Sequence, residues 1–168
     1  MSHLHIIDTN IYRAWVDGEH ERHAGVLRRV KELGKAFVYV SVVTVAEMEF
    51  GLSRHHRLSP ELVQEIRRGL SEFRVLDILH EDHVAEPYGK LRAWLVAHYS
   101  PKNKRQRISS LSQLADPITD IELGIQENDL WLASQAIATE AVLVTFDRMT
   151  HVCQAARATG LELLFVEW

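Results

Sequence analysis

Short runs of apolar and β-branched residues alternate along this chain with longer segments that have helical periodicity. The clearest runs lie at residues 36–43 and 141–145, where valine, leucine, phenylalanine and tyrosine predominate. Such runs are typical of buried strands. Because helical segments separate consecutive strands, the pattern favours an α/β fold, in which helices cover both faces of a parallel sheet.

The start of one helix is marked by Ser59-Pro60-Glu61, since proline suits the first helical position. Across the chain, strands are expected at residues 4–7, 36–43, 74–79, 141–145 and 161–166, and helices at residues 9–16, 20–33, 44–53, 59–73, 82–98, 128–139 and 149–159. A length of 168 residues with 46% hydrophobic residues suits one domain with a substantial core.

The sequence carries no signal for a membrane or for export. No apolar run approaches the roughly 20 residues that span a bilayer, and the first residues lack the charged-then-apolar pattern of a signal peptide. The single cysteine, Cys153, can form no internal disulfide and no cysteine-based zinc site. We therefore expect a cytoplasmic protein that makes no membrane contact.

Four acidic residues stand where a hydrophobic segment begins or ends, or inside one. Asp8 and Asp147 directly follow predicted strands or their last apolar residues, and the carboxyl ends of parallel strands border the binding crevice. Glu47 interrupts an apolar helical stretch, and Asp129 precedes an apolar helix. If the four carboxylates converge, their repulsion requires a cation, and a cation held by carboxylates suggests phosphate chemistry.

Each of these acids also has an ordinary explanation. Asp8 and Asp129 are good helix caps, and Asp147 is a common turn residue. Glu47 would lie on a packed side of its helix beside Phe50, where a core salt bridge with an arginine is the alternative to a metal. The set is more informative than any single member.

The net charge of −4 argues against general adhesion to nucleic acid, which normally needs a basic face. That argument weakens if the acids hold a divalent ion, because the ion is then the largest local charge. Binding of a phosphate backbone therefore stays open.

Four motifs follow one another in the chain: Ile-Ile-Asp-Thr-Asn-Ile, Ser-Val-Val-Thr-Val-Ala-Glu-Met-Glu-Phe-Gly, Asn-Asp-Leu-Trp-Leu-Ala-Ser-Gln-Ala-Ile-Ala and Leu-Val-Thr-Phe-Asp. Together they resemble the PIN domain and, within it, the VapC-type toxins of toxin–antitoxin pairs. The resemblance implies a three-layer α/β/α sandwich whose mainly parallel central sheet has four to five strands. It covers residues 1–168 as one PIN-like domain, with an expanded helical and loop segment at about 84–126.

The resemblance also implies an activity. Asp8, Glu47, Asp129 and Asp147 match the family's acidic quartet, which makes them the expected catalytic residues and metal ligands. Oxygen ligands favour Mg²⁺ or Mn²⁺. The chain would then be a metal-dependent endoribonuclease, the toxin of a type II toxin–antitoxin module, and would hydrolyse RNA phosphodiester bonds with a metal-activated water.

Two other functions compete with this one. A catalytically silent PIN-fold module that binds protein or RNA is the main alternative. An α/β phosphatase of the haloacid dehalogenase type would need Asp-x-Asp after the first strand, where this chain has Asp8-Thr9-Asn10.

The resemblance implies partners as well. A cognate antitoxin would cover the acidic cleft and neutralise the toxin, which would form a homodimer or a toxin–antitoxin hetero-oligomer. The helices at residues 44–53 and 59–73 are the candidate contacts.

Several further residues are candidates for supporting or RNA-contacting roles. Thr145 matches the small hydroxyl residue two places before the last acid, Asn10 lies in the first motif, and Arg148 is placed to contact a phosphate. A basic run is a candidate guide for RNA or a plain solvated loop: Lys102, Lys104, Arg105 and Arg107. The extra acids Asp116, Asp120 and Glu122 stay open as additions to the quartet, and Glu127 is an alternative to Asp129, which its position directly before the helix favours.

Overall fold

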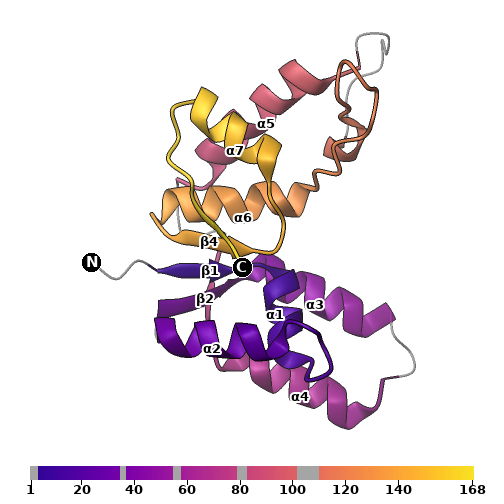
Figure 1. The fold of residues 1–168 in the computed structure, drawn as a ribbon, viewed down its shortest axis with the longest axis vertical. Helices are drawn as coiled ribbons and strands as arrows, with labels where there is room; N and C mark the ends of the chain where they lie inside the picture. The colour runs from indigo at the N-terminus through magenta and orange to yellow at the C-terminus, as the bar shows by residue number, and fades with distance from the viewer. Residues whose placement is uncertain (1–3, 35–36, 55–57, 79–82, 102–109) are drawn as a thin grey trace.

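The computed structural model describes residues 4–34, 37–54, 58–78, 83–101 and 110–168 of the chain (Figure 1). Five parallel strands form one sheet in the order β3-β2-β1-β4-β5. They are β1 (His5–Ile7), β2 (Val38–Ser41), β3 (Arg74–Leu76), β4 (Val142–Thr145) and β5 (Leu164–Glu167). The expected parallel α/β fold is confirmed.

Helices cover both faces of this sheet (Figure 1). Helices α5, α6 and α7 lie on one side, and α1, α2 and α4 lie on the other. The helices are α1 (Thr9–Val16), α2 (His23–Leu33), α3 (Val42–Arg54), α4 (Pro60–Ser71), α5 (Ala85–Tyr99), α6 (Glu127–Ala138) and α7 (Thr150–Ala158). None of the described helices is both long and apolar enough to cross a bilayer.

Successive residues of the central strands point to opposite faces and so supply two cores. Ile6 of β1 and Leu143 of β4 pack with Leu91 of α5 on one face. On the other face Ile7 packs with Ile11 of α1. All five side chains are fully buried, and each such burial stabilises the fold by roughly 1.5–3 kcal/mol. The carboxyl ends of β1 and β4 are therefore firmly held.

The strand expected at residues 36–43 is too long, because β2 ends at Ser41 and α3 begins at Val42. The Ser41 hydroxyl accepts a hydrogen bond from the Val43 N–H (3.0 Å) and so supports an immediate helix start. Tertiary context overrides the β-preference of the two valines here. The start of α4 is as expected, since Ser59 caps the helix by accepting from the Leu62 N–H (3.2 Å).

The segment at about 84–126 contains α5, a 3₁₀ helix η2 (Leu111–Gln113) and a turn at residues 116–121. Leu111 and Leu114 are fully buried in the same core as α5 and α6, so this part of the segment packs on the helical layer. The turn is closed by the Asp116 N–H, which donates to the Ile121 carbonyl (2.9 Å). The basic run at residues 102–107 lies outside the described residues.

Candidate functional site

The carboxyl edge of the sheet reverses its winding between β1 and β4, which are neighbours at the centre. Ligands of open α/β sheets bind at such a switch point. Asp8 directly follows β1, and its N–H donates to the Val144 carbonyl of β4 (2.9 Å). Asp147 lies just past the end of β4. Both predicted acids thus stand at the switch point.

Asp8 is only 6% exposed and uses both carboxylate oxygens. It caps α1 by accepting from the Thr9 N–H (2.5 Å), and it also accepts from the Thr145 hydroxyl (2.7 Å). Burial raises its pKa to about 6, the Thr145 and Thr9 donors oppose that rise, and the nearby carboxylates of Asp129 and Glu47 add to it. The capping role is therefore real, but it does not account for the burial or for the neighbouring charges.

Asp147 is exposed and is tied to the edge of the sheet through Asn10 and Thr145. The Asn10 side-chain amide lies within hydrogen-bond distance of both the Asp147 carboxylate (2.9 Å) and the Thr145 hydroxyl (2.9 Å). The Asn10 amide oxygen accepts from the Phe146 N–H (3.2 Å). Asn10 and Thr145, both predicted supporting residues, therefore connect α1 to the turn that carries Asp147.

Glu47 of α3 is half-buried and is held by two neutral donors. The Thr9 hydroxyl donates to one carboxylate oxygen, and the Asn128 side-chain amide donates to the other (2.6 Å). Within the described part of the chain no lysine or arginine pairs with Glu47, so the alternative of a core salt bridge with an arginine is wrong for these residues. Arg67 of α4 instead pairs with Glu49, which lies on α3 with Glu47 (2.7 Å).

The surroundings of Glu47 also differ from the expected packed helix side. Phe50, which lies nearly one turn further along α3, is 63% exposed. Both residues line a groove rather than the core. Glu47 therefore lies at a rim that solvent can reach.

Asp129 is the third residue of α6, since that helix begins at Glu127, one residue before the expected start at residue 128. Its carboxylate turns back to accept from the Gln126 N–H (2.8 Å). Burial raises its pKa, the Gln126 N–H opposes that rise, and the carboxylates of Asp147 and Glu47 add to it. Like Asp8, it is both a capping residue and a member of the acidic group.

Glu127, the other acid in the first turn of α6, faces a different way. Its carboxylate accepts from the Tyr88 hydroxyl (2.6 Å) and pairs with Arg92 (3.0 Å), and both partners lie on α5. Because it already has a cationic partner, Glu127 is not a member of the acidic group.

The four predicted acids come from four separate segments and influence one another. The carboxylates of Asp129 and Glu47 raise the pKa of Asp8, and those of Asp147 and Glu47 raise the pKa of Asp129. As they stand, no three carboxylate, imidazole or thiol side chains of the described residues are arranged to hold one metal ion. The donor chemistry nevertheless suits a hard cation, since carboxylate and hydroxyl oxygens surround the site.

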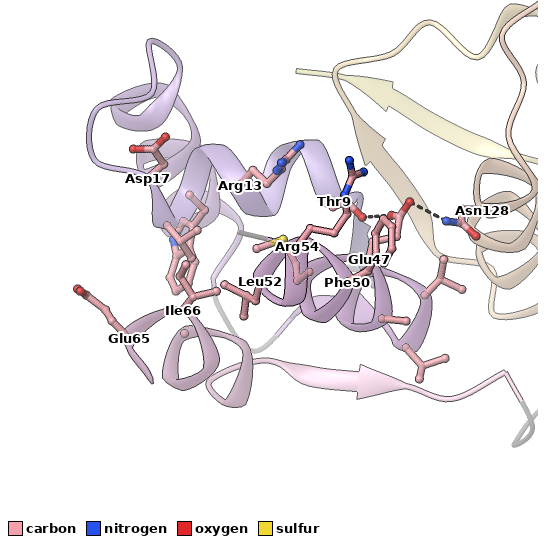
Figure 2. A pocket seen from close by; sticks show the side chains of 18 of the residues that line it. Thr9, Arg13, Asp17, Glu47, Phe50, Leu52, Arg54, Glu65, Ile66 and Asn128 are labelled. Carbon is pink, nitrogen blue, oxygen red and sulfur yellow. Dashed lines mark hydrogen bonds between the residues drawn. The ribbon is translucent and has the colours of Figure 1, made fainter. Parts of the chain in front are cut away.

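A groove of about 1690 Å³ lies beside these acids and is bordered by α1, α3 and α4 (Figure 2). Glu47, Thr9 and Asn128 line the end nearest the acidic group, and Figure 2 shows the two hydrogen bonds that join them. Further along, the lining includes the exposed apolar side chains of Phe50 and Leu62. The predicted partner-contacting helices thus form two walls of one groove.

The remaining candidate residues lie apart from these contacts. Arg148 is exposed directly after Asp147. Asp116 accepts hydrogen bonds from the backbone N–H groups of its own turn, which lower its pKa, and Asp120 and Glu122 are exposed near it. No described contact joins these three acids to the acidic group.

Two residues with clear contacts at the site were not singled out from the sequence, namely Thr9 and Asn128. Each directly adjoins a predicted acid, Asp8 or Asp129, within a motif of the chain. Their position next to these acids is the only hint of their role in the sequence. Glu47, the residue that both contact, lies far from each of them along the chain.

None of the curated protein sequences matches the chain. Similar folds occur in solved chains of VapBC2 from Rickettsia felis bound to a promoter DNA fragment (20% identity, 98% of each chain covered, TM-score 0.64) and of FitAcB from Neisseria gonorrhoeae (19%, 98% of this chain and 97% of that chain, 0.65). Another is VapBC-5 from Mycobacterium tuberculosis, of the VapBC family of toxin–antitoxin systems (19%, 97% of this chain and 98% of that chain, 0.53). The PIN domain family model matches residues 5–156, and the chain therefore belongs to the PIN domain family.

Proposed function

We propose that this chain is a metal-dependent endoribonuclease and the toxin of a type II toxin–antitoxin module. The observation that carries the proposal is the acidic group at the switch point: Asp8, Glu47, Asp129 and Asp147. Neutral groups donate to these carboxylates, and within the described residues no lysine or arginine pairs with them. Uncompensated carboxylates at a binding crevice favour a divalent cation.

The proposed ion is Mg²⁺ or Mn²⁺, with Asp8 and Asp129 as the most direct ligands and Glu47 and Asp147 completing the site. When bound, such an ion makes a water molecule more acidic and stabilises the charge that develops on the phosphate. Because the described side chains are not arranged around one ion as they stand, binding requires the carboxylates to draw together.

Three further residues of the chain have supporting roles in the proposed site. Thr145 donates to Asp8 (2.7 Å) and so keeps that carboxylate directed along the edge of the sheet. Asn10 holds the Asp147 carboxylate (2.9 Å) against the start of α1. Arg148, exposed beside Asp147, is the proposed contact to an RNA phosphate, because guanidinium groups bind phosphate oxygens well.

A cognate antitoxin is the proposed partner, and the groove between α1, α3 and α4 is its proposed binding site. The groove ends at the acidic group and exposes Phe50 and Leu62, which an apolar peptide segment would cover. An arginine of the partner placed among the carboxylates would remove the charge that a metal requires. The similar fold of VapBC-5, a member of the VapBC family of toxin–antitoxin systems, supports the choice of partner.

The silent binding module remains the second candidate, whereas membership of the PIN family excludes the haloacid dehalogenase fold. A silent module would not need the buried Asp8, whose ionisation is disfavoured in the folded protein. The uncompensated acids therefore favour catalysis.

Cleavage of single-stranded RNA tests the proposal directly. We expect the wild type to cleave with Mg²⁺ or Mn²⁺ and to stop when EDTA is added. Asp129→Asn should slow cleavage on the order of a hundredfold or more, a typical cost of losing one electrostatic contact in a catalytic centre. Glu127→Gln is the matched control, because Glu127 lies in the same helical turn but faces α5. Equal rates for the wild type and Asp129→Asn, or cleavage that persists in EDTA, would contradict the proposal.

A further inference from the structure

Glu47 differs from Asp8 and Asp147 because it comes from a helix and not from the edge of the sheet, and it differs from Asp129 because it lies in the middle of its helix and not in the first turn. It lies on α3, at the rim of a groove, where Phe50 nearby is 63% exposed. A glutamate side chain has three rotatable bonds, so in such a place it would sample many orientations unless other groups held it. The structure supplies such groups.

The two oxygens of the Glu47 carboxylate each have their own donor. The Thr9 hydroxyl, at the start of α1, binds one oxygen. The Asn128 side-chain amide, in the first turn of α6, binds the other (2.6 Å). Donors from two different helices restrict both the position and the plane of the carboxylate (Figure 2). Each oxygen keeps a further lone pair for another ligand.

Both donors are neutral, and this distinguishes Glu47 from its neighbour Glu49. Glu49 forms a two-pronged contact with the Arg67 guanidinium (2.8 and 2.7 Å), which offsets its charge. Thr9 and Asn128 orient Glu47 without offsetting its charge. The negative charge of Glu47 therefore remains free to attract a cation.

The same donors also connect Glu47 to the other acids. The Thr9 N–H donates to Asp8 (2.5 Å) while its hydroxyl donates to Glu47, so one residue holds two carboxylates. Asn128 directly precedes Asp129 in the chain, so any shift of Asn128 is coupled to that acid. Glu47 is thereby joined to two acids that the sheet and α6 position.

We propose that Thr9 and Asn128 are positioning residues, which hold the Glu47 carboxylate in the orientation that completes the acidic site. The inference rests on the proposed nuclease function for its catalytic consequence. Its structural part, the orientation of Glu47, does not depend on that function.

The structural part is tested by crystal structures of the wild type, Thr9→Val and Thr9→Ser. Valine has nearly the shape of threonine but lacks the hydroxyl, and serine keeps the hydroxyl. We expect Glu47 to leave its orientation in Thr9→Val and to keep it in Thr9→Ser. An unchanged Glu47 in Thr9→Val overturns the proposal, whether or not the protein cleaves RNA.

The catalytic part is tested by a double-mutant cycle of RNA cleavage with Thr9→Val, Glu47→Gln and the combined variant. Thr9→Val should lower kcat about 10–100-fold with little change in KM, as changes to groups that orient metal ligands typically do. Thr9→Ser should restore most of the rate. If Thr9 acts through Glu47, the combined variant is no slower than Glu47→Gln alone; additive losses would overturn the proposal.

Asn128 allows a second test of the proposal, which measures metal binding and does not depend on RNA cleavage. Asn128→Ala should weaken Mn²⁺ binding in calorimetry about tenfold or more and should have no such effect in the Glu47→Gln background. Equal weakening in both backgrounds would show that Asn128 does not act through Glu47. If the wild type cleaves no RNA, the proposed function fails, while the crystal structures still decide how Glu47 is held.

Discussion

Asp8 and Asp116 both accept hydrogen bonds from backbone N–H groups of the residues that follow them, yet the pKa of Asp8 is raised and that of Asp116 is lowered. Asp8 is 6% exposed at the carboxyl edge of the sheet, and burial raises its pKa to about 6. Asp116 lies in the turn of the expanded segment, where the N–H groups of Thr119 and Ile118 lower its pKa. Local capping is thus common to both, and only the fold decides which acid bears an unfavourable charge.

The largest difference between these two regions is expected in catalysis. Asp8→Asn should reduce the rate of metal-dependent RNA cleavage roughly 10²–10³-fold, because it removes a charged ligand of the proposed ion, and that ion would stabilise the charge on the phosphate. Asp116→Asn should leave the rate within about twofold of the wild type. Cleavage time courses under matched Mg²⁺ concentrations check this, and equal losses in both variants would show that the two regions do not differ in function.

The second difference concerns the dependence of stability on pH without metal. Because the pKa of folded Asp8, about 6, lies above its ordinary value of 3.8, ionising Asp8 costs stability as the pH rises from about 4 to 6. Asp8→Asn removes that cost, so its free energy of unfolding at pH 7.5 should exceed that of the wild type by up to roughly 3 kcal/mol. The advantage should vanish below about pH 4.

Asp116→Asn should behave in the opposite way. Its lowered pKa means that the ionised form stabilises the fold above the ordinary pKa, and this contribution is lost as the pH falls. The variant should therefore be slightly less stable than the wild type at neutral pH and equal to it in acid. Urea unfolding in EDTA at several pH values measures both curves, and parallel curves for the two variants would contradict the assigned environments.

The smallest expected effect is stabilisation by metal. At a Mn²⁺ concentration ten times the dissociation constant, the folded wild type should gain about 1.4 kcal/mol. Asp116→Asn should gain the same amount, whereas Asp8→Asn should gain little. The gain should also fall as the pH drops below about 6, because a protonated Asp8 is a poorer ligand. Thermal unfolding with and without Mn²⁺ measures this, and equal gains in all three proteins would place the ion elsewhere.

Much of the fold was predictable because its signals are local. The apolar run before Asp8 and the Ser59-Pro60 start of α4 depend only on neighbouring residues, and both correspond to observed elements. The junction at Ser41 was missed, since Val42 and Val43 favour a strand locally while the hydroxyl of Ser41 supports a helix start. Local preference is a weak guide where tertiary contacts compete with it.

The candidate site was predictable in its acids but not in the way they are held. Asp8 and Asp147 follow from their place after strands, whereas the contacts of Glu47 reach across the fold. Thr9 and Asn128 are 38 and 81 residues away from it in the sequence. Nothing in a local pattern pairs residues at such separations, so the partners of Glu47 emerge only from the folded chain.

The most direct test of the acidic site is a crystal structure of the wild type soaked in Mn²⁺, with anomalous diffraction used to locate the ion. An anomalous peak at the carboxyl ends of β1 and β4, within ligand distance of Asp8 and Asp129, is the expected result. A well-ordered structure with no peak there, or with Mn²⁺ bound only at a distant site such as the turn of Asp116, would contradict the account.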